Sequence, residues 1–326
     1  MKPMKREFSG VFSEHIVGFI DKKQAMGYDY REGAYILSSF EKFCTKHFPE
    51  VSVLNQEVAL KWAEKRAVEK SRCQLNRISV IREFARYMNS IGVEAYVIPL
   101  GYHTKFQANE RPVPHIYTKD ELNAIFSAAD SYRYQGKSPA RHLVIPVIFR
   151  LMYCCGLRPV EARRLRVEDV DLISGDIKIV ESKGHKDRIV VMSDDMLTLA
   201  RKYDAKVEQI YPDREYFFQS RTGKMYSQPW STDNFRELLI SAELHKKDGR
   251  NPREYDLRHT YATHCLYKWL QNGENINACL PYLSEYMGHA KLSSTAYYIH
   301  LVPEFYPKMI ELGLESSVNI IPEIPL

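Results

Sequence analysis

The chain has 326 residues, which is enough for two domains on the usual scale of about 100 to 200 residues each. Its 46 Lys and Arg against 41 Asp and Glu give a formal net charge of +5, which permits an acidic partner without requiring one. Hydrophobic residues at 44% and charged residues at 27% exclude long disorder and a collagen-like architecture.

The six cysteines form no Cys-x-x-Cys pair, and the N-terminus carries no apolar run of the signal-peptide kind. This usage predicts reduced thiols and a cytoplasmic, nucleoid-associated location. The longest apolar stretch, Leu143–Leu157, is interrupted by Arg150 and is shorter than the roughly 20 residues that cross a bilayer. We therefore expect a buried helix there and no membrane contact.

Residues 1–98 carry apolar residues at helical spacing and no convincing strand alternation. Turn signals at Gly27 and Pro49 separate the periodic segments. We expect a compact helical domain over 1–98. Its predicted helices are Phe12–Ala25, Tyr35–Lys46, Gln56–Lys70 and Ser71–Ile91.

The basic excess is concentrated early, because residues 1–110 hold 17 basic and 13 acidic side chains. Lys61–Arg86 alone has eight basic residues against three acidic ones, a pattern suited to a phosphate backbone. Taken alone, such a run more often marks a solvated helical face. The DNA-contact hypothesis names six residues: Lys61, Lys65, Arg66, Lys70, Arg72 and Arg77.

A linker is predicted over 99–114, where three prolines occur without sustained periodicity. A second domain is predicted over 115–303. The N-cap of its first predicted helix is Thr118, which has Glu121 three residues later in the pattern of a helical capping box.

A hairpin is predicted from Asp176–Glu181 and Arg188–Met192, with its turn at Gly184. Helical patterns surround this hairpin, and a short strand-like segment lies at Tyr216–Gln219. The expected second domain is therefore mainly helical with a small sheet.

Four separated patches carry candidate chemistry. Singly, each has a structural explanation, such as a helix cap or a polar hairpin turn. The patches are Gly156–Ala162, Ser182–Arg188, Tyr255–Thr263 and Met287–His300.

The order of the patches is an Arg in Gly-Leu-Arg, a Lys in a basic hairpin, an Arg in Leu-Arg-His-Thr, a Gly-His pair, and a Tyr nine residues after that His. In this order they resemble the tyrosine recombinases, the family of phage integrases and Xer-type recombinases. The resemblance covers Pro114–Pro303, and the basic helical N-terminal domain looks like the family's core-binding domain. It implies a mainly α fold in which two domains clamp one DNA duplex.

The resemblance assigns the cations of these patches to one phosphodiester. Arg158 and Arg258 suit its non-bridging oxygens, because a guanidinium binds two phosphate oxygens and stays charged. Lys183 suits protonation of the departing 5′ oxygen. Lys186 and Arg188 extend the same basic hairpin and are expected to contact DNA.

The resemblance also selects the nucleophile. Tyr297 and Tyr298 are adjacent, and the family's spacing from His289 selects Tyr298. A tyrosine suits the role because its phosphate ester is reversible, phenoxide being a good leaving group. Tyr297 is expected to project about 100° away into packing. His289 is expected to donate a hydrogen bond to the phosphate.

One position departs from the family, since Tyr255 stands where a His usually precedes the second Arg by three residues. A phenol is a poorer base near neutral pH than an imidazole, so hydrogen bonding to the phosphate is the expected role of Tyr255. Glu161 is expected to orient Arg158 or the active-site framework. His259 is expected to point elsewhere, as a packed or capping residue.

Other site classes find no support in the sequence. It has no glycine-rich loop for ATP or a dinucleotide, and His and Cys do not recur at zinc-ligand spacing. We predict no cofactor and no metal.

The sequence therefore predicts a site-specific DNA recombinase that works through a 3′-phosphotyrosyl intermediate and a Holliday junction, in integration, excision or transposition of a mobile element. The expected partners are two double-stranded DNA sites and an accessory DNA-bending or excision factor. The chain is expected to form a homotetramer on DNA and a monomer or weak oligomer when free. The tail 304–326 is expected to pass to a neighbouring protomer or to pack on its own domain. The alternatives are a DNA-relaxing enzyme like a type IB topoisomerase and a catalytically inactive DNA-binding regulator.

Overall fold

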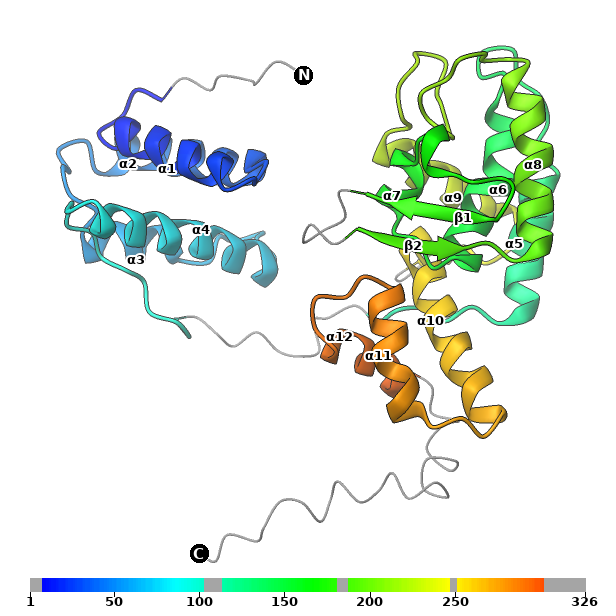
Figure 1. Cartoon of the computed structure of the whole chain (residues 1–326). Coiled ribbons are helices and arrows are strands. Elements are labelled where there is room, and N and C mark those ends of the chain that lie inside the picture. The colour runs from blue at the N-terminus through cyan, green and yellow to red at the C-terminus, as the bar shows by residue number, and fades with distance from the viewer. Residues whose placement is uncertain (1–7, 103–112, 181–186, 247–250, 302–326) are drawn as a thin grey trace, which may run out of the picture. The chain divides into compact units, whose positions relative to one another are not determined.

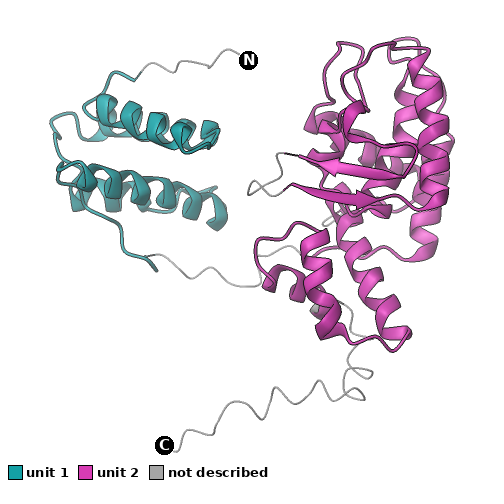
Figure 2. Ribbon diagram, in the orientation of Figure 1, with its two compact units in different colours: residues 1–112 teal, residues 113–326 magenta. Residues whose placement is uncertain are grey.

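The computed structural model describes residues 8–102, 113–180, 187–246 and 251–301. The chain divides into two compact units, residues 1–112 and 113–326 (Figure 2). The described elements are mainly helices with one two-stranded sheet, so the predicted fold class is confirmed. None of the described helices is both long and apolar enough to cross a membrane.

The first unit packs its helices around an aromatic core. Phe12 is almost fully buried and contacts the rings of Phe40 and Phe84. Trp62 closes the core by an edge-on contact with Phe40. The helices of this unit are α1 (Ser13–Ala25), α2 (Arg31–His47), α3 (Gln56–Ala63) and α4 (Ser71–Ser90) (Figure 1).

Helix α3 is shorter than predicted, because side chains of α4 bind its last carbonyl groups. Gln74 donates to the carbonyl oxygen of Ala63 at 2.9 Å. Arg77 donates to the carbonyl oxygens of Trp62 and Glu64. The final carbonyls of a helix need partners from outside the helix, and α4 supplies them at this point.

The second unit begins with the capping box that the sequence predicts. Thr118 Oγ1 accepts a hydrogen bond from the Glu121 backbone N at 3.2 Å, and Glu121 Oε2 accepts one from the Thr118 N at 2.8 Å. The helices of this unit are α5 (Lys119–Asp130), α6 (Arg141–Cys154), α7 (Pro159–Arg164), η2 (Val167–Asp169), α8 (Asp194–Glu208), α9 (Gln228–Ser241), α10 (Glu254–Gln271), α11 (Ile276–Tyr286), α12 (Ser293–Ala296) and η3 (Tyr297–Leu301).

Helix α6 is the predicted buried apolar helix. It packs against α5, α8 and α10, and its side chains fill the centre of the unit's largest core. In this way α6 fixes α7, which follows it directly, relative to α10. Candidate Arg158 is the N-cap residue of α7, and candidate Arg258 lies on α10.

The predicted hairpin is confirmed. Strand β1 (Asp176–Ile179) pairs antiparallel with β2 (Arg188–Val191), and Ile177 lies opposite Val190 on the buried face. The predicted turn lies outside the described residues. The strand-like segment at Tyr216–Gln219 is not a strand, because only single bridges form at its two ends, while Phe217 and Phe218 within it are buried.

A smaller core joins the last elements of the second unit. Leu266 of α10 and Leu283 of α11 are buried together with Met287 and Tyr298. Figure 1 shows α11 beside α10 and α12 beside α11, and η3 also contacts α10. This packing places the predicted nucleophile against the helix that carries the second candidate arginine.

Candidate active site

Arg258 on α10 is fully buried, and the chain's own backbone holds its guanidinium. Its Nη atoms donate to the carbonyl oxygens of Gly156 and Met287, and Nη2 lies 3.3 Å from His289 Nε2. Burial lowers the pKa of Arg258, and the charge of Arg158 adds to this effect. Among the described residues, Arg258 Nε has no hydrogen-bond partner. One buried donor is therefore left for an acceptor from outside the described residues.

Glu161 on α7 is the anion of the cluster. Its Oε1 lies 2.6 Å from Arg158 Nη1, and its Oε2 lies 2.7 Å from Arg188 Nη2 and 3.9 Å from Arg258 Nη1. Burial pulls the pKa of Glu161 upward, but the hydrogen bond and charge of Arg188, with Arg158 and Arg258, outweigh it and bring the pKa to about 2. Three guanidiniums therefore face one ionised carboxylate.

Two glycines let the backbone approach these arginines. Gly156 and Gly288 have φ values of +61° and +62°, in the left-handed region that disfavours a side chain. A Cβ on Gly156 would lie 2.6 Å from Tyr261 Cδ1, and one on Gly288 would lie 3.0 Å from Arg188 Nη1. Glycine is thus required in the Gly-Leu-Arg and Gly-His patches for a geometric reason.

His289 lies between Arg258 and Tyr298. Its Nδ1 is 2.8 Å from Thr295 Oγ1, and its ring is stacked on that of Tyr298 with centroids 6.0 Å apart. Burial, followed by the charges of Arg258 and Arg158, lowers the pKa of His289 to about 4. The imidazole is therefore neutral at neutral pH.

Tyr298 on η3 is buried, with 2% of its surface exposed. Burial raises its pKa to about 12, although the charges of Arg258 and Arg158 act in the opposite direction. Tyr297 is 36% exposed, so its predicted place in the packing is wrong. Of the two adjacent tyrosines, Tyr298 is the one that lies with the arginines and His289.

His259 was expected to point elsewhere, and this expectation is also wrong. Its Nδ1 lies 3.2 Å from Tyr298 Oη. Burial lowers the pKa of His259 to about 4. The ring of Tyr255, one turn earlier on α10, has its centroid 5.0 Å from that of His259. The spacing of four residues indicates the contact between Tyr255 and His259, but the contact of His259 with Tyr298 joins residues 39 positions apart and has no signal in the sequence.

The basic hairpin differs from its prediction. Arg188, expected to contact DNA, is buried, and its Nε also donates to the carbonyl oxygen of Tyr286 at 2.8 Å. Its pairing with Glu161 gives it a place inside the cluster. Lys183 and Lys186 lie outside the described residues.

The six N-terminal residues that are predicted to contact DNA differ in their exposure to solvent. Arg77 is buried and pairs with Glu69 at 2.8 Å, so its predicted contact with DNA is corrected to a contact within the unit. The guanidinium of Arg66 lies over the Trp62 ring, 4.9 Å from its centroid. The exposed members of the set are Lys61, Lys65, Arg66, Lys70 and Arg72.

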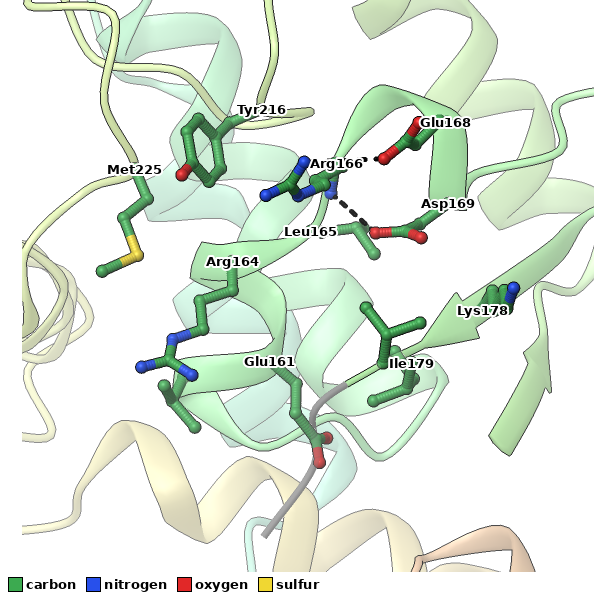
Figure 3. Close-up of a pocket in the computed structure, with 12 residues that line it drawn as sticks. Glu161, Arg164, Leu165, Arg166, Glu168, Asp169, Lys178, Ile179, Tyr216 and Met225 are labelled. Atoms are coloured by element: carbon green, nitrogen blue, oxygen red, sulfur yellow. Dashed lines mark hydrogen bonds and ion pairs between the residues drawn. The ribbon is translucent and has the colours of Figure 1, made fainter. Parts of the chain in front are cut away.

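Glu161 also lines a cavity of about 710 Å³ (Figure 3). Arg164, Arg166 and Lys178 surround it, and Arg166 pairs with Glu168 at 3.6 Å. Neither the buried tyrosine of η3 nor the buried arginine of α10 lines this cavity. It is a hollow of mixed charge next to the cluster, with the Glu161 side chain between the two.

The sequence of residues 116–304 matches the model of the phage integrase family. Two putative integrase/recombinases of Sinorhizobium fredii, y4rB and y4rE, are 27% and 28% identical to the chain; each alignment covers 90% of this chain, with 94% and 92% of the relatives. The tyrosine recombinase XerD of Staphylococcus epidermidis is 27% identical over 61% of this chain and 62% of its own.

Solved structures share the fold. The XerH site-specific recombinase bound to palindromic difH substrate has a TM-score of 0.63 at 17% identity, covering 88% of this chain and 78% of its own. The Tn1549 transposon integrase in complex with transposon right end DNA has a TM-score of 0.62 at 14% identity, covering 89% and 94%. Fold and relatives together define a site-specific recombinase enzyme of the tyrosine class. The chain belongs to the phage integrase family.

Proposed function

We propose that this chain cuts and rejoins DNA at two specific sites by transesterification at Tyr298. The observation that carries the proposal is that a buried tyrosine of η3, the arginines at the N-cap of α7 and on α10, and a histidine of the loop before α12 meet in one cluster. Tyr298 Oη forms a bond to phosphorus, the bond from phosphorus to the 5′ oxygen breaks, and a 3′-phosphotyrosyl ester remains. The proposed acid for the 5′ oxygen is Lys183.

The charge of the cluster supports a phosphate as its ligand. Three guanidiniums beside one carboxylate leave positive charge in a buried place, where an anion is strongly favoured. Arg258 Nε is a buried donor that a phosphate oxygen would satisfy. We assign Arg158, Arg258 and His289 to the phosphate oxygens, Tyr255 to a hydrogen bond beside them, and Glu161 to holding the arginines.

The larger assembly is also a proposal. We assign residues 1–98 to binding the DNA core through the exposed basic residues of α3, α4 and their connection, and 99–114 to the linker. Strand exchange through a Holliday junction between two sites would use a homotetramer, with the tail 304–326 passing between protomers. Relatives named as integrases and a transposon integrase favour integration, excision or transposition of a mobile element in the cytoplasm, with or without an accessory DNA-bending factor.

The test of this proposal uses nicked duplexes tiled across the DNA that flanks the gene. A nick just beyond the cleavage point lets the short 5′-hydroxyl strand diffuse away and traps the covalent adduct. We expect a trapped adduct with the wild-type chain, none with Tyr298→Phe, and an undiminished adduct with the control Tyr297→Phe. An adduct that survives Tyr298→Phe would overturn the assignment.

The same DNA separates the two alternative functions. A recombinase exchanges segments between two plasmid copies of the trapped site, whereas a relaxing enzyme removes supercoils from a plasmid that lacks it. Absence of any adduct, together with retained DNA binding, would identify an inactive regulator and overturn the proposal.

A further inference from the structure

We infer that His259 is the catalytic base that takes the proton of Tyr298 during DNA cleavage. The inference rests on the proposed function and adds a residue to it. His259 Nδ1 lies 3.2 Å from Tyr298 Oη, within reach of a hydrogen bond to the reacting atom, and the two ring centroids are 5.5 Å apart. His259 follows Arg258 directly on α10, so one helix presents both a phosphate-binding cation and a base to the same tyrosine.

The second histidine of the cluster, His289, contacts other groups. Its Nδ1 lies 2.8 Å from Thr295 Oγ1, and its Nε2 lies 3.3 Å from Arg258 Nη2. Both ring nitrogens are thus directed at groups other than Tyr298 Oη. Among the described residues, His259 is the imidazole in contact with that hydroxyl.

The substitution at position 255 becomes understandable in this arrangement. The family's usual imidazole is replaced by the phenol of Tyr255, which contacts the His259 ring at 5.0 Å. His259, which belongs to the Leu-Arg-His-Thr patch, is the imidazole that remains on this part of α10, one helical turn after Tyr255. Tyr255 then packs against the base and limits the orientations of its ring.

The surroundings of His259 favour its neutral form, which is the form that accepts a proton. Burial is the main reason that its pKa is lowered to about 4. Arg253 at the N-cap of α10 and Arg258 on α10 act in the same direction, and Asp256 acts in the opposite one. Among the described residues of the facing elements, Tyr298 lies against the ring and His289 is a further titratable group close to it. A bound phosphate would add negative charge and favour the imidazolium that forms.

The proton and electron pairs balance in both directions of the reaction. As Tyr298 Oη bonds to phosphorus, its proton moves to His259 Nδ1, and the 5′ oxygen leaves with its electron pair and takes a proton from the assigned acid. On rejoining, the 5′ hydroxyl attacks phosphorus, the phenol oxygen leaves, and His259 returns the proton. No oxidant or further reactant is needed.

The experiment measures single-turnover cleavage of the nicked duplex by the full chain carrying His259→Asn or His259→Ala. Asn keeps an acceptor near the position of Nδ1 but is not a base, so it separates proton transfer from positioning. We expect both variants to cleave about 100-fold more slowly or worse, with unchanged DNA affinity, and added imidazole to restore cleavage by the Ala variant. Full cleavage by the Asn variant would overturn the inference.

His264→Asn is the matched control. It lies on the same helix, and its Nδ1 is 3.0 Å from Tyr153 Oη, so it makes the same kind of contact away from the cluster. We expect its cleavage rate to be close to that of the wild type. An equal loss in the His264 variant would show that any damaged histidine–tyrosine contact on α10 has this effect, and would overturn the catalytic role of His259.

A duplex with sulfur in place of the 5′ bridging oxygen separates base from acid. A thiolate leaves without a proton, so this substrate rescues the loss of an acid but not the loss of a base. We expect no rescue of His259→Asn, and rescue would reassign the residue. If the wild type forms no adduct, the proposed function fails; if it does and His259→Asn equals it, only this inference fails.

Discussion

At the scale of single residues, Glu161 determines whether the arginine cluster can exist in a folded chain. Each buried guanidinium carries a desolvation cost, which paired charges offset only when the geometry is good. Arg158 and Arg188 both contact the Glu161 carboxylate at hydrogen-bond distance, and Arg258 lies at its edge. Because one carboxylate serves three cations, the loss of its charge affects all of them together.

We predict that Glu161→Gln lowers the free energy of unfolding by about 3 kcal/mol, the usual cost of removing one partner from a buried ion pair. Urea unfolding measures the change. The matched control is Glu168→Gln on the exposed pair with Arg166, where the expected loss is below about 1 kcal/mol. Equal losses in the two variants would contradict the role given to Glu161.

At the scale of elements, the junction of α3 and α4 shows that arginines in one basic run do different work. Arg77 is buried and binds carbonyl groups at the end of α3, while Arg72 on the same helix is exposed. Side chains five residues apart on an α-helix project in directions that differ by more than a quarter of a turn around the axis. Arg72 therefore faces solvent while Arg77 faces the core. Charge alone does not distinguish the two.

We predict that Arg77→Leu lowers the stability of the first unit by about 2 kcal/mol, because it leaves Glu69 and two carbonyl groups without their donor. Arg72→Ala is expected to change stability by less than about 0.5 kcal/mol. If Arg72 contacts a phosphate, its loss lowers the slope of log affinity against log salt by about 0.9. Thermal unfolding and DNA titrations at several salt concentrations measure both, and a reversal of the two effects would refute this division.

The same scale shows what the sequence alone could predict. Apolar periodicity and capping residues locate α1, α4, α5 and the hairpin, because these depend on local patterns. The end of α3 depends on side chains from α4, and the segment at Tyr216–Gln219 has strand-like residues without a neighbouring strand to pair along its length. The ordered motifs indicate Tyr298 and Arg258, but the contact of His259 with Tyr298 arises only when η3 packs on α10.

At the scale of the whole molecule, the two units bury different titratable groups, so their stabilities depend differently on pH. The second unit buries His259 and His289 in neutral form, with pKa values of about 4, and ionised Glu161 with a pKa of about 2. The core of the first unit is aromatic, and its buried Arg77 pairs with Glu69, whose pKa that pairing also lowers. Between pH 6.5 and 4.5, above the ordinary pKa of a glutamate, acid therefore acts mainly on the unit that holds the cluster.

We predict that the second unit loses stability as the pH falls from 6.5 to 4. In this window the unfolded chain protonates His259, whose ordinary pKa is 6.5, while the folded chain does not until about 4, so the unfolded state binds more protons and stability decreases with acid. After allowance for solvent screening, His259 contributes on the order of 2 kcal/mol across the window. Below pH 4.5 the folded pKa of Glu161, about 2, adds a second loss of the same sign.

Scanning calorimetry of the full chain over this pH range measures the prediction, with His259→Phe as the variant that keeps a buried ring but does not titrate. The unfolding transition of the second unit is expected to move to lower temperature with acid in the wild type, and to move less in His259→Phe. The transition of the first unit, which has no buried neutral histidine among its described residues, is expected to move less over the same range. Identical pH dependence of the wild type and His259→Phe would show that the imidazole against Tyr298 is not held neutral by burial, and would remove the basis for its action as a base.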